Sequence, residues 1–187
     1  MKQKLIIGLV GEKGSGKETF GNFLLELMKD KRIERVRFSD LLKETLTLWN
    51  ISLTRENLQK IAVLMEGGFG EGTLSNAIYQ RVLKIKADVI ILDGVRWVSD
   101  EKLIRKFSDN LIIYITAKLK IRYERLKKRT EKVDEAKTYT QFINEEKAKN
   151  ELLIPKIGSR ADIKIENNES LNNLEVKIKD FFKTLQF

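Results

Sequence analysis

The chain has 187 residues, of which 42% are hydrophobic and 34% charged, as expected for one globular domain with its own core. It contains neither Cys nor His, which excludes disulfides, thiolate nucleophiles and Cys-based zinc sites and removes the commonest general base. Any chemistry must therefore use carboxylates, Lys, Arg and backbone amides. The longest apolar runs, 5–11 and 88–94, are far too short to span a bilayer, and no signal-peptide pattern is present, so a cytoplasmic protein is expected.

The charge balance is strongly basic, with 36 Lys and Arg against 27 Asp and Glu and a formal net charge of +9. This balance favours polyanionic partners, either nucleic acid or phosphorylated small molecules. No aromatic RNA-binding signature and no helix-turn-helix pattern accompanies it. A solvated, Lys-rich surface accounts for the charge equally well. Nucleic-acid binding therefore stays open without being preferred, and the oligomeric state is not predicted.

In chain order, buried strands alternate with amphipathic helices. The runs 4–10, 88–93 and 110–116 are continuously apolar, as strands of a parallel sheet covered on both faces are. Shorter strand candidates are 35–38 and 162–166. Helical spacing places apolar residues on one face of 17–30 and of the last helix: Phe20, Phe23, Leu24 and Leu27 in the first, and Leu171, Leu174, Ile178, Phe181 and Leu185 in the second. The alternation predicts a doubly wound α/β domain.

Two regions interrupt this alternation. Residues 39–86 run through several helical segments and contain the glycine-rich stretch MEGGFGEGT, which could close over a ligand or simply join two helices. Residues 129–153 are highly charged, and Thr138 with Gln141 has the spacing of a capping box. We interpret both regions as insertions in a single domain that spans residues 1–187.

The stretch GEKGSGKET, residues 11–19, has the spacing of a phosphate-binding loop. Gly11, Gly14, Ser15, Gly16 and Lys17 follow a predicted buried strand and open a predicted helix, which is the context that this motif requires. The glycines allow backbone N–H groups to converge on phosphate oxygens at the positive end of a helix. The lysine would reach the β- and γ-phosphates. A glycine-rich turn alone would explain neither the lysine nor the density of glycines.

Five segments in order resemble the nucleoside-monophosphate-kinase group of phosphate-loop kinases: GSGKET, FSDLLKE (38–44), DGVR (93–96), RYERLKKR (122–129) and ADIKIENNESL (161–171). The chain most resembles archaeal proteins described as related to dephospho-coenzyme A kinase, and also viral deoxynucleoside monophosphate kinases. The likeness is weakest over 50–85 and 130–155. It implies an α/β/α sandwich with a five-stranded parallel sheet in the order 2-3-1-4-5, an acceptor-binding insertion at about 39–86 and a lid at about 129–153.

For the phosphate donor, the resemblance implies that the Thr19 hydroxyl meets the α-phosphate of ATP. Glu18 stands where dephospho-coenzyme A kinases carry Ser or Thr, so Mg²⁺ would be held by nucleotide phosphates and waters. Asp93 would be an indirect, water-mediated magnesium carboxylate. Arg125 would stack on the base and Arg129 reach the phosphates.

On the adenine side, the resemblance places Asn168, together with Asn167, in a loop that borders the base. For the acceptor, Arg96 resembles the arginine that grips the acceptor phosphate. Ser39 and Asp40 follow a short strand where the group places its acceptor helix. Arg55 and Gln59, four residues apart, share one face of the next predicted helix.

Together these residues predict a kinase that transfers the γ-phosphoryl group of ATP to a nucleoside or deoxynucleoside monophosphate. Lys17, Arg96, Arg129 and Mg²⁺ would neutralise charge in the transition state. Dephospho-coenzyme A is the alternative acceptor, with Asp40 or Asp93 orienting its hydroxyl. A different class remains open, namely a nucleotide-binding regulator or nucleic-acid-associated protein without kinase turnover.

Overall fold

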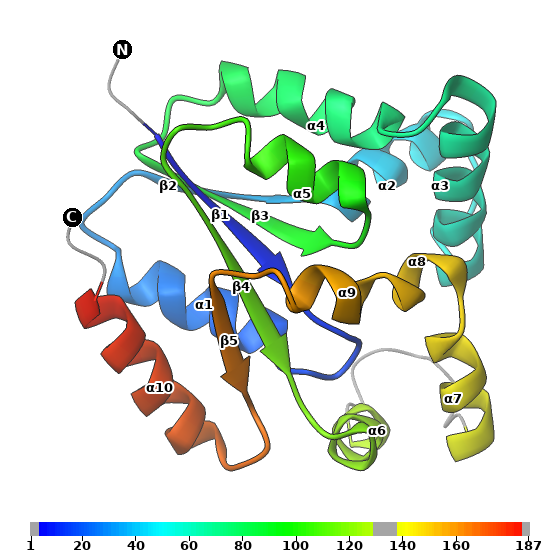
Figure 1. Ribbon diagram of the computed structural model, residues 1–187. Coiled ribbons are helices and arrows are strands. Elements are labelled where there is room, and N and C mark those ends of the chain that lie inside the picture. Colours follow the sequence, from blue (N-terminus) through cyan, green and yellow to red (C-terminus); the bar gives the residue numbers. More distant parts are fainter. Residues whose placement is uncertain (1–3, 129–137, 185–187) are drawn as a thin grey trace.

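The computed structural model of the protein describes residues 4–128 and 138–184. Five parallel strands form one sheet in the order β2-β3-β1-β4-β5, which confirms the predicted fold and strand order (Figure 1). The strands are β1 Leu5–Val10, β2 Ile33–Arg37, β3 Val89–Val95, β4 Asn110–Thr116 and β5 Ile163–Glu166.

Helices cover both faces of this sheet. In Figure 1, α1 and α10 lie on one face, and α4, α5 and α9 lie on the other, with α2 and α3 beside them. The helices are α1 Lys17–Leu27, α2 Phe38–Leu48, α3 Arg55–Phe69, α4 Thr73–Lys84, α5 Val98–Ile104, α6 Leu119–Lys127, α7 Tyr139–Glu146, α8 Lys149–Leu152, α9 Ile154–Gly158 and α10 Leu171–Thr184.

The central strand β1 shows why its sequence is continuously apolar. Successive side chains of a strand point to opposite faces of the sheet. Leu5, Ile7 and Leu9 pack in the core shared with α1 and α10, whereas Ile6 and Val10 pack in the core on the other face. Since helices cover both faces, every residue of β1 is buried.

The first insertion contains α2, α3 and α4. Its glycines are divided between a helix and a turn. Gly67 and Gly68 lie within α3, whereas Gly70 and Gly72 have φ values of 100° and 88° in the turn that leads into α4. The Glu66 carboxylate accepts a hydrogen bond from the Gly72 N–H at 2.6 Å. In this structure the glycine-rich stretch therefore joins two helices.

The second insertion is described from residue 138 onward. Thr138 and Gln141 form the predicted capping box: the Thr138 hydroxyl accepts from the Gln141 N–H at 3.2 Å, and Gln141 Oε1 accepts from the Thr138 N–H at 2.8 Å. Residues 129–137 and the last three residues lie outside the described ranges. The predictions for Arg129 and Leu185 therefore have no structural counterpart here.

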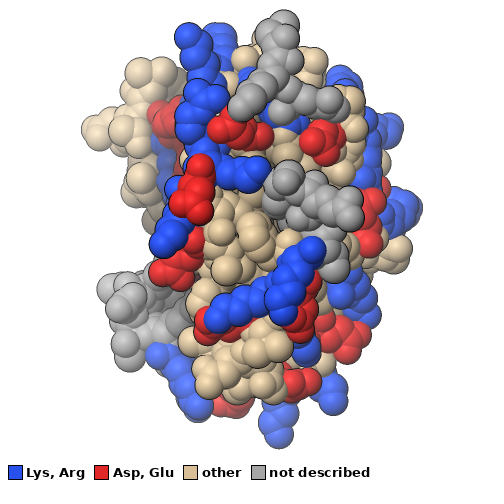
Figure 2. Space-filling view, turned by 90° about the vertical axis from the view of Figure 1, so that its left-hand side faces the viewer, with Lys and Arg blue, Asp and Glu red and all other residues tan. Residues whose placement is uncertain are grey.

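Figure 2 shows the side of the molecule where the amino ends of the strands lie. On this side Lys and Arg are interspersed with Asp and Glu, so the visible surface is mixed in sign. Within the described ranges, every helix falls short of the length and apolar character that a membrane span requires.

Candidate functional site

The loop between β1 and α1 is packed too closely for side chains at its glycines. Gly14 and Gly16 have φ values of 77° and 95°, a region that glycine adopts readily and most other residues do not. A Cβ atom at Gly11 would lie 2.4 Å from the Ile115 carbonyl oxygen, and one at Gly14 would lie 2.7 Å from the Arg122 carbonyl oxygen. The loop therefore rests directly on β4 and α6, as a backbone cradle for an anion requires.

Ser15 lies at the centre of this loop and is completely buried. Its hydroxyl has no hydrogen-bond partner among the described residues. The Asn167 side chain, which follows β5, donates to the Ser15 carbonyl oxygen at 2.8 Å and ties the loop to that strand end. Because an unpaired buried hydroxyl costs free energy, a bound phosphate oxygen would stabilise this arrangement. The residues of the loop thus fit a phosphate group.

Asp93 is presented to the loop by a bulge in β3. Leu9 of β1 pairs with Asp93 and the next residue, Val10, pairs with Val95. Gly94 is therefore the extra residue, with a φ of 92°. A bulge of this kind bends a strand locally and re-aims the neighbouring side chain. Asp93 is 6% exposed, so its carboxylate is nearly removed from solvent.

Three cations surround the Asp93 carboxylate. Lys17 Nζ lies 3.4 Å from Asp93 Oδ1, Arg35 Nη2 lies 2.6 Å from Oδ2, and Arg37 Nε lies 3.6 Å from Oδ2. Burial by itself raises the pKa of Asp93, but the charges and hydrogen bonds of Lys17 and Arg35 outweigh burial and hold this pKa below its ordinary value. The mouth of the loop is therefore rich in positive charge around one permanent anion.

Arg35 and Arg37 were not identified from the sequence, where they appeared only as part of a short strand. Arg35 is nearly buried, and its Nη1 donates to Asn22 Oδ1 at 2.7 Å. Arg37 is half-exposed, with Nη2 3.9 Å from Glu18 Oε1. The two arginines stand two residues apart, a spacing that places side chains on one face of a strand. The spacing of Arg35 and Arg37 is the sequence feature from which both could have been predicted.

On the acceptor side, Arg55 and Arg96 meet at one carboxylate of the second insertion, that of Glu151. Arg96 Nη1 donates to Glu151 Oε1, and Arg55 Nη2 lies 3.6 Å from the same oxygen. Arg55 Nη1 also lies 2.9 Å from Glu145 Oε2, which is 3.2 Å from Lys13 Nζ of the phosphate loop. The structure thus brings together, from separate elements, two of the arginines predicted for the acceptor. Neither glutamate was singled out in the sequence.

A buried aspartate fixes the backbone at Arg96. Asp100 Oδ2 accepts from the N–H groups of Arg96 at 2.9 Å and Trp97 at 3.0 Å, and Asp100 Oδ1 accepts from Ser75 Oγ at 2.6 Å. Burial raises the pKa of Asp100 to about 6, against the effect of these hydrogen bonds and with a contribution from Glu66. Asp100 therefore orients the turn that carries Arg96.

The other predicted acceptor residues lie on the first insertion. Ser39 and Asp40 stand in the first turn of α2, and Asp40 pairs with Lys43 at 3.1 Å. Gln59 lies one turn after Arg55 in α3. Asp40 therefore has its own counter-ion next to it on α2.

The predicted base-side residues gather where β5 ends. Arg125 Nη2 donates to Asn167 Oδ1 at 3.3 Å and to the Glu169 carbonyl oxygen at 3.2 Å. Asn168 Oδ1 accepts from the Lys118 N–H at 2.8 Å. Since Asn167 also holds the phosphate loop, Arg125 lies one side chain away from that loop.

Two carboxylates near the phosphate loop, those of Asp93 and Glu18, are the side chains that a Mg²⁺ ion brought by a nucleotide could meet. Asp93 and Glu18 are both within ion-pair distance of Arg37. The described residues contain no cluster of three or more side chains that could hold a metal without a nucleotide, and Mg²⁺ commonly keeps several waters in phosphate sites.

Thr19 lines a hollow of about 600 Å³ along α1, together with Asn22 and Phe23.

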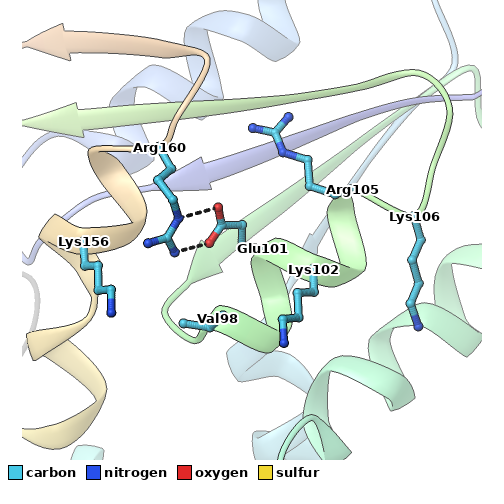
Figure 3. Close-up of a pocket in the computed structure, with 7 residues that line it drawn as sticks. All are labelled: Val98, Glu101, Lys102, Arg105, Lys106, Lys156 and Arg160. Atoms are coloured by element: carbon cyan, nitrogen blue, oxygen red, sulfur yellow. Dashed lines mark hydrogen bonds and ion pairs between the residues drawn. The ribbon is translucent and has the colours of Figure 1, made fainter.

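A separate basic hollow of about 430 Å³ lies between α5 and α9 (Figure 3). The residues that line it are Val98, Glu101, Lys102, Arg105, Lys106, Lys156 and Arg160. No residue of the phosphate loop is among them. Arg160 Nε donates to Glu101 Oε1 at 2.9 Å, and Arg105 Nη1 donates to Asp162 Oδ2 at 2.8 Å. Each of these arginines is thus paired with a carboxylate, and the hollow lies apart from the phosphate loop.

No protein-family model matches the chain. Among curated proteins, it is 27% identical over 180 residues to a UPF0200 protein of Pyrococcus horikoshii, covering 94% of each chain. It is 26% identical over 180 residues to a UPF0200 protein of Sulfurisphaera tokodaii, covering 96% of this chain and 97% of the relative. The name of these relatives states no activity.

Among solved structures, shikimate kinase from Bacteroides thetaiotaomicron has a TM-score of 0.63 at 13% identity, with 98% of this chain and 99% of that chain covered. Shikimate kinase from Acinetobacter baumannii in complex with shikimate has a TM-score of 0.57 at 19% identity, with 99% and 97% covered. Similarity at such low identity establishes architecture rather than chemistry. The chain therefore has a phosphate-loop kinase-like fold, and its likeness to dephospho-coenzyme A or deoxynucleoside monophosphate kinases stays a prediction.

Proposed function

We propose that the protein is a magnesium-dependent kinase that transfers the γ-phosphoryl group of ATP to a nucleoside or deoxynucleoside monophosphate. The observation that carries this proposal is that donor-side and acceptor-side cations share one carboxylate. Lys13 of the phosphate loop and Arg55 of α3 lie 3.2 and 2.9 Å from Glu145 Oε2. The two sets of cations are thus close enough to bind two adjacent phosphate groups, which phosphoryl transfer requires.

On the donor side, the loop amides bind the phosphates of ATP and Lys17 neutralises charge on the β- and γ-phosphates. Arg35 and Arg37 add positive charge around Asp93, where negative charge would otherwise accumulate. Mg²⁺, when bound, supplies further charge neutralisation; nucleotide phosphates and waters would hold it, with Asp93 as the water-mediated carboxylate. Arg125 binds the base side of the nucleotide, and Arg129 completes the contacts to its phosphates.

On the acceptor side, Arg96 and Arg55 bind the acceptor's phosphate. A phosphate oxygen acts as a nucleophile without a general base, whereas the hydroxyl of dephospho-coenzyme A would benefit from one. Asp93 is poorly suited to that role, because its pKa is held below the ordinary range by Lys17 and Arg35. This electrostatic setting favours a monophosphate acceptor, with dephospho-coenzyme A as the second candidate.

A transfer assay tests the proposal. Purified protein is incubated with γ-labelled ATP, Mg²⁺ and a panel of nucleoside monophosphates, deoxynucleoside monophosphates and dephospho-coenzyme A, and the labelled product is identified. We expect a labelled nucleoside diphosphate. Label on dephospho-coenzyme A alone would select the second candidate. Nucleotide binding without transfer to any of these acceptors would instead favour a regulator that uses the same loop.

A further inference from the structure

One buried carboxylate serves two arginines that come from different parts of the fold. Glu151, in α8, is 5% exposed. Its Oε1 accepts from Arg96 Nη1 and lies 3.6 Å from Arg55 Nη2. Its Oε2 is buried and has no hydrogen-bond partner among the described residues. The guanidinium groups of Arg55 and Arg96 therefore share one oxygen of the Glu151 carboxylate, while its other oxygen has no hydrogen bond among the described residues.

A carboxylate is a poor match for this pair of arginines. Both arginines contact Oε1 of Glu151, so Oε2 makes no hydrogen bond among the described residues. Burying an unpaired carboxylate oxygen costs free energy. A phosphate monoester offers three terminal oxygens and carries about −1.5 to −2 charges at neutral pH. It could give each guanidinium its own oxygen, and guanidinium forks are well suited to phosphate. The position of Glu151 therefore suits a phosphate better than the group that occupies it.

The segment that carries Glu151 is attached to the rest of the protein by several such pairs. Besides the contacts of Glu145 with Lys13 and Arg55, Glu146 Oε2 lies 2.6 Å from Arg122 Nη1. Burial raises the pKa of Glu146, Arg122 lowers it, and nearby Glu151 raises it again. Repulsion within the segment thus opposes its ion pairs. An anion that bound the same arginines would compete directly with the segment.

We propose that the Glu151 carboxylate occupies the place of the acceptor's phosphate, and that a phosphate monoester binds between Arg55 and Arg96 by displacing it. This inference rests on the proposed function for the identity of the site and adds how the site selects its substrate. A neutral acceptor cannot compete with Glu151 for the two arginines, whereas a dianion can. Glu151 is then a specificity-determining residue that admits phosphorylated acceptors.

Inorganic phosphate and the variant Glu151→Gln test the proposal by calorimetry. The variant removes the negative charge of Glu151, which competes with phosphate for Arg55 and Arg96. A larger fraction of the protein then has this site open, so its affinity for phosphate should rise about tenfold or more. The gain should vanish in Glu151→Gln/Arg96→Ala, which separates this site from phosphate bound at the loop. Glu101→Gln, which alters a carboxylate–arginine pair elsewhere, is the matched control and should leave affinity unchanged. Unchanged or weakened phosphate binding in Glu151→Gln would overturn the proposal.

A second measurement needs no change at Glu151. In the wild-type protein, inorganic phosphate should accelerate amide hydrogen exchange in α7 and α8, and this effect should be lost in Arg96→Ala. Unaltered or slower exchange there would contradict displacement. If the protein shows both phosphate effects but transfers no phosphoryl group, displacement of Glu151 is supported and the proposed kinase activity is contradicted. If the protein is a working monophosphate kinase whose acceptor KM is unaffected by Glu151→Gln, the kinase activity is supported and displacement of Glu151 is contradicted.

Discussion

Lys17 Nζ lies 3.4 Å from Asp93 Oδ1, at the point where the phosphate loop meets the bulged end of β3. Lys17 opens α1, directly after the loop that follows β1, whereas Asp93 lies on β3, the strand that pairs with β1. Arg35 holds the other carboxylate oxygen. Because Asp93 is nearly buried and its pKa is lowered, it remains an anion at neutral pH. This fixed anion orients the cations on which the proposed phosphoryl transfer depends.

Arg96→Ala should weaken use of the acceptor far more than binding of ATP. The Arg96 guanidinium contacts Glu151 beside Arg55, in the place proposed for the acceptor's phosphate. Its loss would remove a charge-assisted hydrogen bond to that phosphate, worth about 1.5–3 kcal/mol. We expect the acceptor KM to rise by roughly tenfold or more, with the ATP KM nearly unchanged. Arg105→Ala, which removes an exposed arginine paired with Asp162, is the control. If ATP affinity fell while acceptor affinity held, Arg96 would belong to the donor side.

Gly21→Ala should lower turnover although alanine is the better helix former. A Cβ atom at Gly21 would lie 2.9 Å from Arg35 Cζ, so the guanidinium that binds Asp93 must shift. We expect a severalfold fall in kcat for phosphoryl transfer and retention of the folded state by circular dichroism. Turnover equal to that of the wild type would show that the position of Arg35 is unimportant.

Gly67→Ala is the matched control for that substitution. Gly67 also lies within a helix, but a Cβ atom there would meet nothing within 4 Å. The free energy of unfolding should rise by about 0.8–1 kcal/mol from helix propensity alone, and turnover should be unchanged. Urea denaturation and the transfer assay measure the two quantities on the same samples.

Glu18→Ser should leave activity within about threefold of the wild type, as for an exposed substitution. Glu18 is half-exposed, and its carboxylate lies 3.9 Å from Arg37, a distance at which an ion pair contributes little. The measurement is kcat/KM for ATP over a range of Mg²⁺ concentrations. Loss of most activity, restored by high Mg²⁺, would mean that Glu18 binds the metal directly.

Asp100→Asn should change how stability depends on pH. Burial raises the pKa of Asp100 from 3.8 to about 6, so its protonation stabilises the folded state. That contribution is fully present below pH 3.8 and is lost as the pH rises through about 6. The free energy of unfolding of the wild type minus that of Asp100→Asn should therefore fall across this window. A difference independent of pH would contradict the raised pKa.

Asp162→Asn provides a control of opposite sign. Burial raises the pKa of Asp162, but Arg105 and the Ile112 N–H outweigh burial and hold the pKa below its ordinary value. Its contribution to stability is present above the unfolded pKa and is lost as the pH falls through the folded one. Urea denaturation of both variants at a series of pH values should give differences that change in opposite directions.

The sequence predicted the fold well because the strands and the loop have strong local patterns. β1, β3 and β4 are continuous apolar runs, and the glycines around Ser15 have a spacing tied to a specific backbone shape. Of the three cations around Asp93, the sequence singled out only Lys17. Lys17 stands in a motif, but Arg35 and Arg37 stand in a short, partly exposed strand whose neighbour in the sheet cannot be read from local pattern.

The acceptor side depended still more on tertiary structure. The expectation for Arg96 came from resemblance and that for Arg55 from its helical spacing with Gln59, and the structure places the two arginines at one carboxylate. Glu145 and Glu151, however, sit among many charged residues of the second insertion, where no periodicity separates a buried carboxylate from a solvated one. Only the packing of α7 and α8 against the phosphate loop and α3 gives these two glutamates their role.

Transfer of labelled phosphoryl from ATP, measured side by side for the wild type and Lys17→Ala across the monophosphate panel, tests the central claim most directly. We predict a labelled nucleoside diphosphate with the wild type and none with Lys17→Ala, while circular dichroism shows the same fold for both. Transfer to no acceptor by the wild type, together with salt-sensitive binding of RNA or DNA, would contradict the kinase proposal.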